Sequence, residues 1–298
     1  MPLVTLESVL YDAVQGGYAV GAFNFNGIED ARGILEAAAQ KRSSVILMSS
    51  VSAVKYIGGP KAVVGLVRGL VDELDIPVVL HLDHAEEQDI IYSCVDAGFT
   101  SVMIDGSKLS FEDNVAISHQ VVRYAHKFGV SVEAELGKIG GHEENILLST
   151  KDAVLTDPGE AVRFAKLTGI DALAVAIGTA HGFYKDEPKL DFDRLRQIHS
   201  LTNIPLVLHG GTGVPDEDLV RSIKYGISKI NVGTELKFCC SQTVRKAVTE
   251  QPEQIDIRKL VGNARVNCRE IVRHKIELFG SAAKKLTDDV KANEIMTA

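Results

Sequence analysis

Histidines end or follow three separate apolar segments of this 298-residue chain. His84 ends the segment Ile-Pro-Val-Val-Leu-His-Leu-Asp-His, His209 ends Ile-Pro-Leu-Val-Leu-His, and His181 follows a third apolar run. Any one of these imidazoles could simply hydrogen-bond to the backbone. Together, and with Asp83 beside one of them, they match the number of protein ligands that a catalytic zinc takes while one position stays open for substrate. The sequence therefore predicts a zinc site.

Two glycine-rich segments predict a neighbouring site for phosphate. Gly-Gly-Thr follows His209 directly, and Asn-Val-Gly-Thr at 231–234 follows the last apolar run. Backbone N–H groups in such turns bind phosphate oxygens together with hydroxyl groups. Lys185 could add a positive charge there, or it could be an ordinary solvated lysine. The candidate substrate- and phosphate-binding residues are Asn24, Gly182, Lys185, Gly210, Gly211, Thr212, Asn231, Gly233 and Thr234.

These segments need a scaffold that brings their ends together. Apolar runs occur near residues 19–24, 45–49, 77–82, 101–104, 130–135, 172–177, 205–209 and 228–232, with helical patterns between them. Eight strand–helix units predict an α/β fold, a (β/α)8 TIM barrel, whose active sites lie at the carboxyl ends of the strands. The charged sequence after about residue 235 predicts additional C-terminal helices, followed by a mobile tail from about 284. A doubly wound open sheet is the alternative, but no Gly-x-Gly-x-x-Gly follows the first strand.

The composition is that of one globular domain. Hydrophobic residues make up 45% of the chain, and no linker-like segment divides residues 1–298. The formal charge of −8 argues against a nucleic-acid partner, and no apolar run is long enough to span a membrane. The four cysteines show no paired metal-ligand spacing and are expected to be reduced thiols. These features predict a cytoplasmic protein.

The other histidines are expected to have structural or surface roles. Side chains alternate along a strand, so His81 shares a side with Asp83 and not with His84, and we expect it inside the barrel. Helical and mostly charged surroundings predict surface positions for His119, His126, His199 and His274.

Longer motifs resemble one enzyme family over nearly the whole chain. They are Leu-His-Leu-Asp-His at 80–84, Val-Glu-Ala-Glu-Leu-Gly at 132–137, Ala-Ile-Gly-Thr-Ala-His-Gly at 176–182, Leu-His-Gly-Gly-Thr-Gly at 208–213 and Asn-Val-Gly-Thr-Glu-Leu at 231–236. These motifs resemble the class II, zinc-dependent ketose-bisphosphate aldolases. The resemblance is to the tagatose-bisphosphate branch, because fructose-type members usually carry an aspartate where this chain has Gly233.

The resemblance implies a reaction and roles for individual residues. The reaction is reversible aldol cleavage of tagatose 1,6-bisphosphate to dihydroxyacetone phosphate and glyceraldehyde 3-phosphate, through an enediolate that Zn²⁺ on the three histidines stabilises. Asp83 would be the acid and base at the aldehyde oxygen. Glu143, or its neighbour Glu144, would be the carboxylate of a mobile loop that removes a proton from the ketone. Asp105 and Glu135 would offer a second metal position, and a monovalent cation, Na⁺ or K⁺, would lie near the phosphate.

Several alternatives stay open on the sequence. The substrate could be fructose 1,6-bisphosphate or another phosphoketose, because discrimination at one hydroxyl rests on contacts worth about 1–3 kcal/mol. A non-catalytic, aldolase-like partner subunit would not need the histidines and Asp83. A Schiff-base aldolase would need a lysine at the catalytic end of a strand, whereas Lys229 enters its strand from the opposite end. A zinc hydrolase would need a base against metal-bound water. The family also implies a homodimer or homotetramer, with or without a helper subunit.

Overall fold

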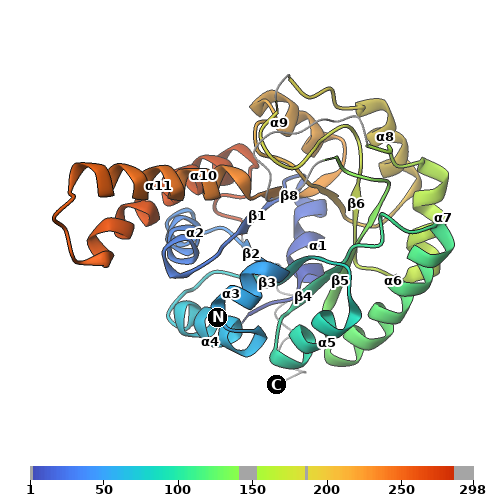
Figure 1. The fold of residues 1–298 in the computed structure, drawn as a ribbon. Helices are drawn as coiled ribbons and strands as arrows, with labels where there is room; N and C mark the ends of the chain where they lie inside the picture. Colours follow the sequence, from blue (N-terminus) through green and yellow to red (C-terminus); the bar gives the residue numbers. More distant parts are fainter. Residues whose placement is uncertain (1–2, 141–152, 185–186, 285–298) are drawn as a thin grey trace.

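Eight parallel strands close into a barrel in the computed structural model, which describes residues 3–140, 153–184 and 187–284 (Figure 1). Each strand pairs with the next along the chain, and β8 pairs back with β1. The strands are β1 (Val20–Asn24), β2 (Val45–Ser50), β3 (Val78–Ala85), β4 (Ser101–Ile104), β5 (Ser131–Leu136), β6 (Ala172–Val175), β7 (Leu206–Leu208) and β8 (Ile227–Val232). The (β/α)8 barrel predicted from the sequence is confirmed.

The strands are buried on both faces, which explains their nearly unbroken apolar sequences. Every residue of β1, β5 and β8 is buried. One set of alternating side chains packs outward against helices, and the other set fills the barrel. A polar residue on the inward set therefore lies inside the barrel and needs a polar partner there.

Helices form the outer layer of the barrel, apart from α1. They are α1 (Leu6–Gly16), α2 (Ile28–Lys41), α3 (Val51–Ile57), α4 (Pro60–Val71), α5 (Gln88–Ala97), α6 (Phe111–Ala125), α7 (Pro158–Thr168), α8 (Phe192–Leu201), α9 (Asp216–Lys224), α10 (Thr234–Glu250) and α11 (Ile257–Leu278), with a short 3-10 helix, η1 (His126–Phe128). None of the helices in the described ranges is long and apolar enough to cross a membrane.

Helix α1 lies across the amino-terminal end of the barrel, opposite the carboxyl ends of the strands (Figure 1). Its apolar face, which includes Leu6 and Leu10, is fully buried. This face forms one cluster with inward-facing residues of β1, β2, β3, β6 and β7, among them Ile46 and Val79. The amino-terminal half of the barrel interior is therefore a packed apolar core.

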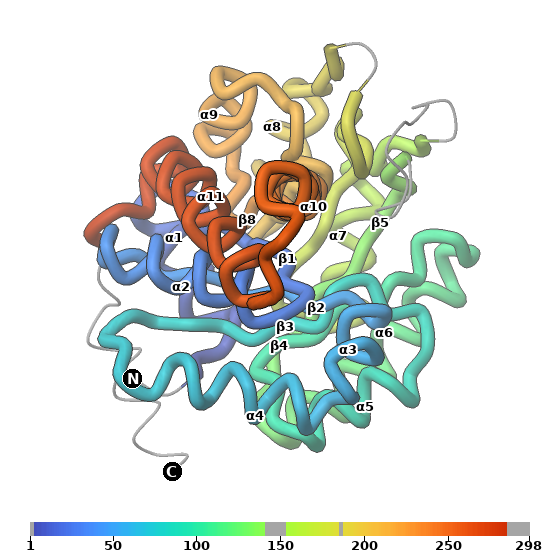
Figure 2. Tube along the Cα trace, turned by 60° about the vertical axis from the view of Figure 1, so that its left-hand side comes forward, coloured from blue at the N-terminus to red at the C-terminus, as the bar shows by residue number. Residues whose placement is uncertain are grey.

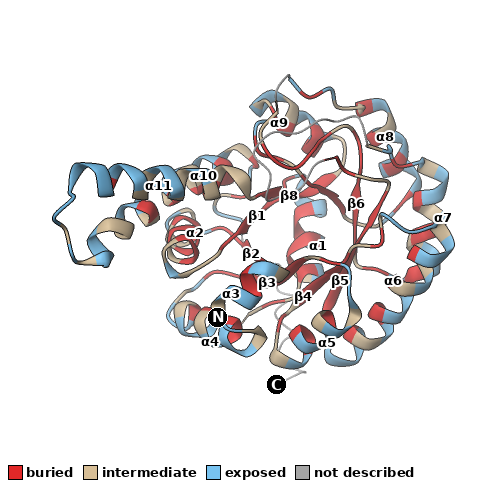
Figure 3. Ribbon diagram, in the orientation of Figure 1, coloured by how far each residue is buried: buried red, intermediate tan, exposed pale blue. Residues whose placement is uncertain are grey.

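The C-terminal helices α10 and α11 form a hairpin that extends away from the barrel (Figures 1 and 2). Helix α11 packs along α2, and the two helices cross closely at Gly33, where a Cβ would lie 2.7 Å from the backbone oxygen of Arg265. Exposed residues gather toward the outer part of the hairpin (Figure 3). The additional C-terminal helices predicted from the sequence are present, whereas the predicted tail beyond residue 284 lies outside the described residues.

Candidate active site

An irregularity in β3 brings two neighbouring residues to the same site. Between Leu82 and Ala85 the register with β4 shifts by one residue, and His84 has a φ of 44°. Regular alternation would put Asp83 and His84 on opposite faces of the sheet. Instead, Asp83 accepts a hydrogen bond inside the barrel, and His84 faces His209. The sequence-based placement of the pair on alternate faces was wrong, because the bulge has no marker in the residue types.

Three imidazoles meet at the carboxyl end of the barrel. One ring nitrogen from each of His84, His181 and His209 lies within 4.8 Å of the others. His84 Nε2 is 2.7 Å from His209 Nδ1, and the ring centroids of His84 and His181 are 4.7 Å apart. The side chains come from β3, the segment after β6 and the end of β7. The structure thus brings together the three histidines on which the zinc prediction depends.

Carboxylates behind the imidazoles determine which ring nitrogens carry lone pairs. His84 Nδ1 is 2.8 Å from Asp105 Oδ2, and His209 Nε2 is 2.8 Å from Glu133 Oε1. A carboxylate accepts, so each of these ring nitrogens donates and carries the hydrogen. His84 Nε2 and His209 Nδ1 face each other across the remaining 2.7 Å contact, which is a hydrogen bond when one of them carries a proton. Burial would lower the pKa of His84, but Asp83 and the hydrogen bond to Asp105 raise it well above its ordinary value, so His84 can carry that proton. Loss of this proton would leave the lone pairs of both nitrogens free to bind a metal ion. A three-imidazole donor set of this kind fits zinc.

Two further carboxylates form a second group with His84. Ligand atoms of His84, Asp105 and Glu135 all lie within 4.8 Å of one another. Burial would raise the pKa of Asp105, but the hydrogen bonds from His84 and Ser107 hold it below its ordinary value. Burial, and then the nearby Asp105 charge, raise the pKa of Glu135 to about 8. A cation bound here would displace the Glu135 proton, so this group suits a second metal position.

Asp83 is a buried carboxylate held by two amides. Asn24 Nδ2 donates to Asp83 Oδ2 at 2.8 Å, and Asn231 Nδ2 approaches Asp83 Oδ1 at 3.5 Å. Burial would raise the pKa of Asp83, but the positive charge nearby, first of all that of His84, lowers it below its ordinary value. Asp83 is therefore an oriented carboxylate beside the imidazoles, ready to accept a proton.

A buried ion pair lies directly beneath the imidazoles. Lys229 Nζ is 2.8 Å from Glu133 Oε2 and donates to Asn231 Oδ1 at 2.7 Å, and both charged side chains are fully buried. His81 lies beside this pair, with Nδ1 2.8 Å from Ser101 Oγ. Burial, and then the charge of Lys229, lower the pKa of His81 to about 3, so its ring is neutral. His81 thus lies inside the barrel, as predicted.

A pocket beside the imidazoles is formed by both predicted phosphate-binding segments. Its lining residues are His181, Gly182, His209, Gly210, Thr212, Asn231, Gly233 and Thr234. Helix α10 begins at Thr234, and the amino terminus of a helix attracts anions. Thr212 Oγ1 accepts from the Glu235 N–H at 3.2 Å, which leaves the hydroxyl hydrogen for another acceptor. Gly211 does not line this pocket, and its N–H donates to the Asn231 backbone oxygen.

Two close contacts fix the walls of this pocket. The Tyr184 hydroxyl accepts from the Ala180 N–H at 2.8 Å and donates to the Gly210 oxygen at 2.9 Å, so it joins the segments after β6 and β7. A Cβ at position 233 would lie 2.4 Å from Asn24 Oδ1. Any larger residue than glycine at this position would therefore displace Asn24, which holds Asp83.

Other predicted residues lie apart from this cluster. Glu143, Glu144 and Lys185 lie outside the described residues. The four histidines predicted at the surface are all exposed: His119, His126, His199 and His274.

Sequence reasoning missed the residues that support the imidazoles. Glu133, Lys229 and Tyr184 had no predicted role, and Lys229 was set aside because its strand position is far from the catalytic end. Its long side chain instead runs along the barrel interior to reach Glu133. The available signal was the alternation itself, because Glu133 shares a side with Glu135 and Lys229 shares one with Asn231.

Comparisons with known proteins agree on one family. The model of a family described as fructose-bisphosphate aldolase class-II matches residues 4–284. A fructose-bisphosphate aldolase of Geobacillus stearothermophilus is 47% identical over 286 residues, which cover 95% of this chain and 99% of that protein. A fructose-bisphosphate aldolase of Staphylococcus aureus is 45% identical over 284 residues, with the same coverage of both chains. The crystal structure of the YdjI aldolase from Escherichia coli K12 superposes with a TM-score of 0.82 at 32% identity, over 95% of this chain and 99% of that one.

Proposed function

The chain belongs to the class II fructose-bisphosphate aldolase family and is a carbon–carbon lyase, and on this premise we propose that it cleaves fructose 1,6-bisphosphate. The products are dihydroxyacetone phosphate and glyceraldehyde 3-phosphate, and the reverse reaction joins them. Relatives that match over nearly their whole length are named for the fructose substrate. The preference for tagatose 1,6-bisphosphate predicted from the sequence finds no support among these relatives.

Gly233, the basis of the tagatose prediction, lies against Asn24 in the structure. A side chain at this position would collide with Asn24, and Asn24 donates to Asp83. A side chain at position 233 would therefore require the Asn24 side chain to move, so the residue at this position also affects the group that holds Asp83. The two ketoses differ at one hydroxyl, and such a difference rests on contacts of about 1–3 kcal/mol.

The observation that carries the proposal is the convergence of three imidazoles, in which His84 Nε2 and His209 Nδ1 face each other within reach of His181. These three residues would hold the zinc. A zinc ion bound there would act as a Lewis acid and polarise the carbonyl of the ketose. Glu133 and Asp105 orient two of these imidazoles by accepting their outer N–H groups, so that the inner ring nitrogens face the position of the metal.

Asp83 is the group that moves a proton. In the cleavage direction it accepts the proton of the hydroxyl on carbon 4 as the bond between carbons 3 and 4 breaks, and in synthesis it returns that proton to the aldehyde oxygen. Asn24 and Asn231 orient the carboxylate, and its lowered pKa keeps it ionised and ready to accept. Asn24 Oδ1 is buried and has no hydrogen-bond partner among the described residues, so it is available to a substrate hydroxyl.

The pocket at the start of α10 binds a phosphate group of the substrate. The Thr234 N–H at the start of the helix and the Thr212 hydroxyl are its donors, because the next three N–H groups of the turn donate to Thr212 Oγ1 and to the Gly233 oxygen. Anchoring the phosphate holds the sugar with its carbonyl near the three imidazoles and orients it for reaction. The sequence predictions of a monovalent cation at this phosphate, of Glu143 as the second base and of a homodimer or homotetramer belong to the same proposal.

The test is an assay of both ketose bisphosphates with the purified protein, coupled to detection of dihydroxyacetone phosphate. We expect cleavage that favours fructose 1,6-bisphosphate, is lost with a chelator and returns with Zn²⁺. A tagatose preference would overturn the substrate proposal but leave the aldolase mechanism. Full activity in chelated protein shown to contain no metal would overturn the metal role. His119→Ala, on the exposed face of α6, is the matched control for histidine variants.

A further inference from the structure

Two cysteines far apart in sequence meet between the C-terminal helices. Cys240 on α10 and Cys268 on α11 have their sulfur atoms 3.1 Å apart. Neither thiol is needed for the chemistry at the carboxyl end of the barrel. A disulfide has a sulfur–sulfur bond of about 2.0 Å, so a small rotation of one side chain would bring this pair to bonding distance.

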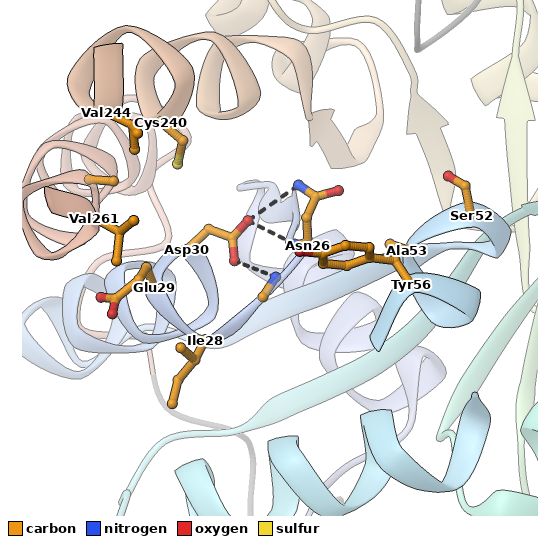
Figure 4. A pocket seen from close by; sticks show the side chains of 12 residues that line it. Asn26, Ile28, Glu29, Asp30, Ser52, Ala53, Tyr56, Cys240, Val244 and Val261 are labelled. Atoms are coloured by element: carbon orange, nitrogen blue, oxygen red, sulfur yellow. Dashed lines mark hydrogen bonds between the residues drawn. The ribbon is translucent and has the colours of Figure 1, made fainter. Parts of the chain in front are cut away.

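The two thiols differ in their access to solvent. Cys240 lines a cavity of about 580 Å³ between α2, α3, α10 and α11 (Figure 4). Cys268 is fully buried behind it. A small solute that enters this cavity therefore meets Cys240 first. The hydrogen bond from Cys268 lowers the pKa of the Cys240 thiol, whereas the same contact raises that of Cys268. Cys240 is thus the better nucleophile of the two.

The close packing of α2 and α11 holds Cys268 in place. A Cβ at Gly33 would lie 3.2 Å from the Cβ of Cys268 and 2.7 Å from the backbone oxygen of Arg265. Because the two helices touch here without an intervening side chain, α11 has little freedom to carry Cys268 away from α10. Cys268 is therefore held on a helix that is packed closely against α2.

We propose that Cys240 and Cys268 form an oxidisable pair, which a hydroperoxide converts to a disulfide between α10 and α11. The Cys240 thiolate attacks one peroxide oxygen, the O–O bond breaks, and Cys240 becomes a sulfenic acid while hydroxide leaves and is protonated to water. Cys268 then loses its proton and attacks the Cys240 sulfur, the S–O bond breaks, and a second water leaves. Two thiols and one hydrogen peroxide thus give one disulfide and two waters.

The disulfide would fix the helix whose first turn lines the candidate phosphate pocket. Helix α10 begins at Thr234, and its Glu235 N–H donates to Thr212 in the segment after β7. Cys240 lies six residues after Thr234 on the same helix. Only this link to the phosphate pocket rests on the proposed function, because the thiol chemistry does not depend on substrate.

The other cysteines provide matched controls. Cys239 is adjacent to Cys240 on α10, and burial raises the pKa of its thiol. Cys94 is fully buried on α5, and burial raises the pKa of its thiol to about 12. Neither of them combines the lowered pKa with a place in the cavity wall.

The experiment treats the metal-loaded, full-length protein with hydrogen peroxide, alkylates the remaining thiols and maps the peptides without reduction. We expect free thiols to fall from four to two per chain, with one cross-linked species that joins the peptides of Cys240 and Cys268 and is reversed by dithiothreitol. Cys239→Ser and Cys94→Ser should behave like the unmodified sequence, whereas Cys240→Ser should form no cross-link.

Three outcomes would overturn the proposal. They are four free thiols after treatment, a cross-link through Cys239, and overoxidation of Cys240 without a link. Because the peptide map of the unmodified sequence separates these outcomes by itself, the conclusion does not depend on the folding of any variant. Peptide maps also report the thiols directly, so a failure of aldolase activity would not affect the result.

Discussion

The half of the barrel that α1 closes is filled with apolar side chains, whereas the other half contains imidazoles, carboxylates, amides and a lysine. The same strands build both halves. Along the inward-facing side of β3, Val79 belongs to the apolar cluster, and His81 and Asp83 follow it toward the carboxyl end. On β7, Val207 precedes His209 in the same way. Each of these strands is therefore held by apolar packing at its amino-terminal end and carries the polar side chains of the site at its carboxyl end.

The side chains of the two halves are held in place by different interactions. An apolar core tolerates small changes in shape and depends on the area it buries. In the polar half, each buried group needs a particular partner, as Glu133 needs both Lys229 and His209. This contrast predicts that changes in the polar half have large and specific effects, whereas comparable changes in the apolar half affect stability alone.

The largest effect is expected from His209→Ala. This change removes one of the three imidazoles and leaves Glu133 Oε1 without its hydrogen-bond donor, so zinc should be lost together with cleavage. A metal ion stabilises the reacting oxygens by several kcal/mol, so we expect activity to fall roughly 10⁴-fold or more. Metal analysis and the coupled cleavage assay measure both losses. Normal zinc content with normal activity would remove His209 from the metal site, and His119→Ala should change neither.

Next in size is Lys229→Met, which leaves the Glu133 carboxylate buried without its cation. Breaking a buried ion pair on one side costs about 3–5 kcal/mol. We expect a loss of this size in the free energy of unfolding, measured by urea denaturation of the metal-loaded protein.

The double change Glu133→Gln with Lys229→Met is the control for this pair. It removes both charges and should recover part of the lost stability. If Lys229→Met alone had no effect, the ion pair would not be what holds the polar half together.

A smaller effect is expected from Asn24→Ala, which removes the amide that orients Asp83. A hydrogen bond to a charged group contributes about 1.5–3 kcal/mol, so kcat should fall by roughly 10- to 100-fold. Zinc content should stay normal, because Asn24 does not contact an imidazole in the described structure. Loss of zinc in this variant would mean that Asn24 acts through the metal site instead of through Asp83.

The smallest effect is expected in the apolar half. Ile46→Val removes one methyl group from the cluster against α1 and should lower the free energy of unfolding by about 0.5–1.5 kcal/mol. The kcat should not change, because the space left by the missing methyl group lies in the apolar half of the barrel, away from the reacting atoms in the polar half. A fall in kcat as large as that of Asn24→Ala would contradict the division of the barrel into two independent halves.

The sequence predicted the apolar half and the strand order better than the detailed geometry of the site. Periodic apolar runs indicate a barrel, and histidines at strand ends indicate a metal, because both depend on local residue types. The bulge at His84 and the reach of Lys229 depend on how neighbouring strands pair and pack, which no local pattern encodes. The contact of Gly233 with Asn24 is likewise invisible in the sequence, because the two residues are far apart along the chain.

The left-handed backbone of His84 has a consequence for how this chain can evolve. A residue other than glycine costs about 1–2 kcal/mol in this conformation, so at position 84 the demands of folding and catalysis are opposed. His181 and His209 are not among the non-glycine residues with positive φ in the described structure. In a lineage released from catalysis, glycine at position 84 would relieve backbone strain. A descendant that kept the barrel but lost the reaction would therefore be expected to lose this histidine first.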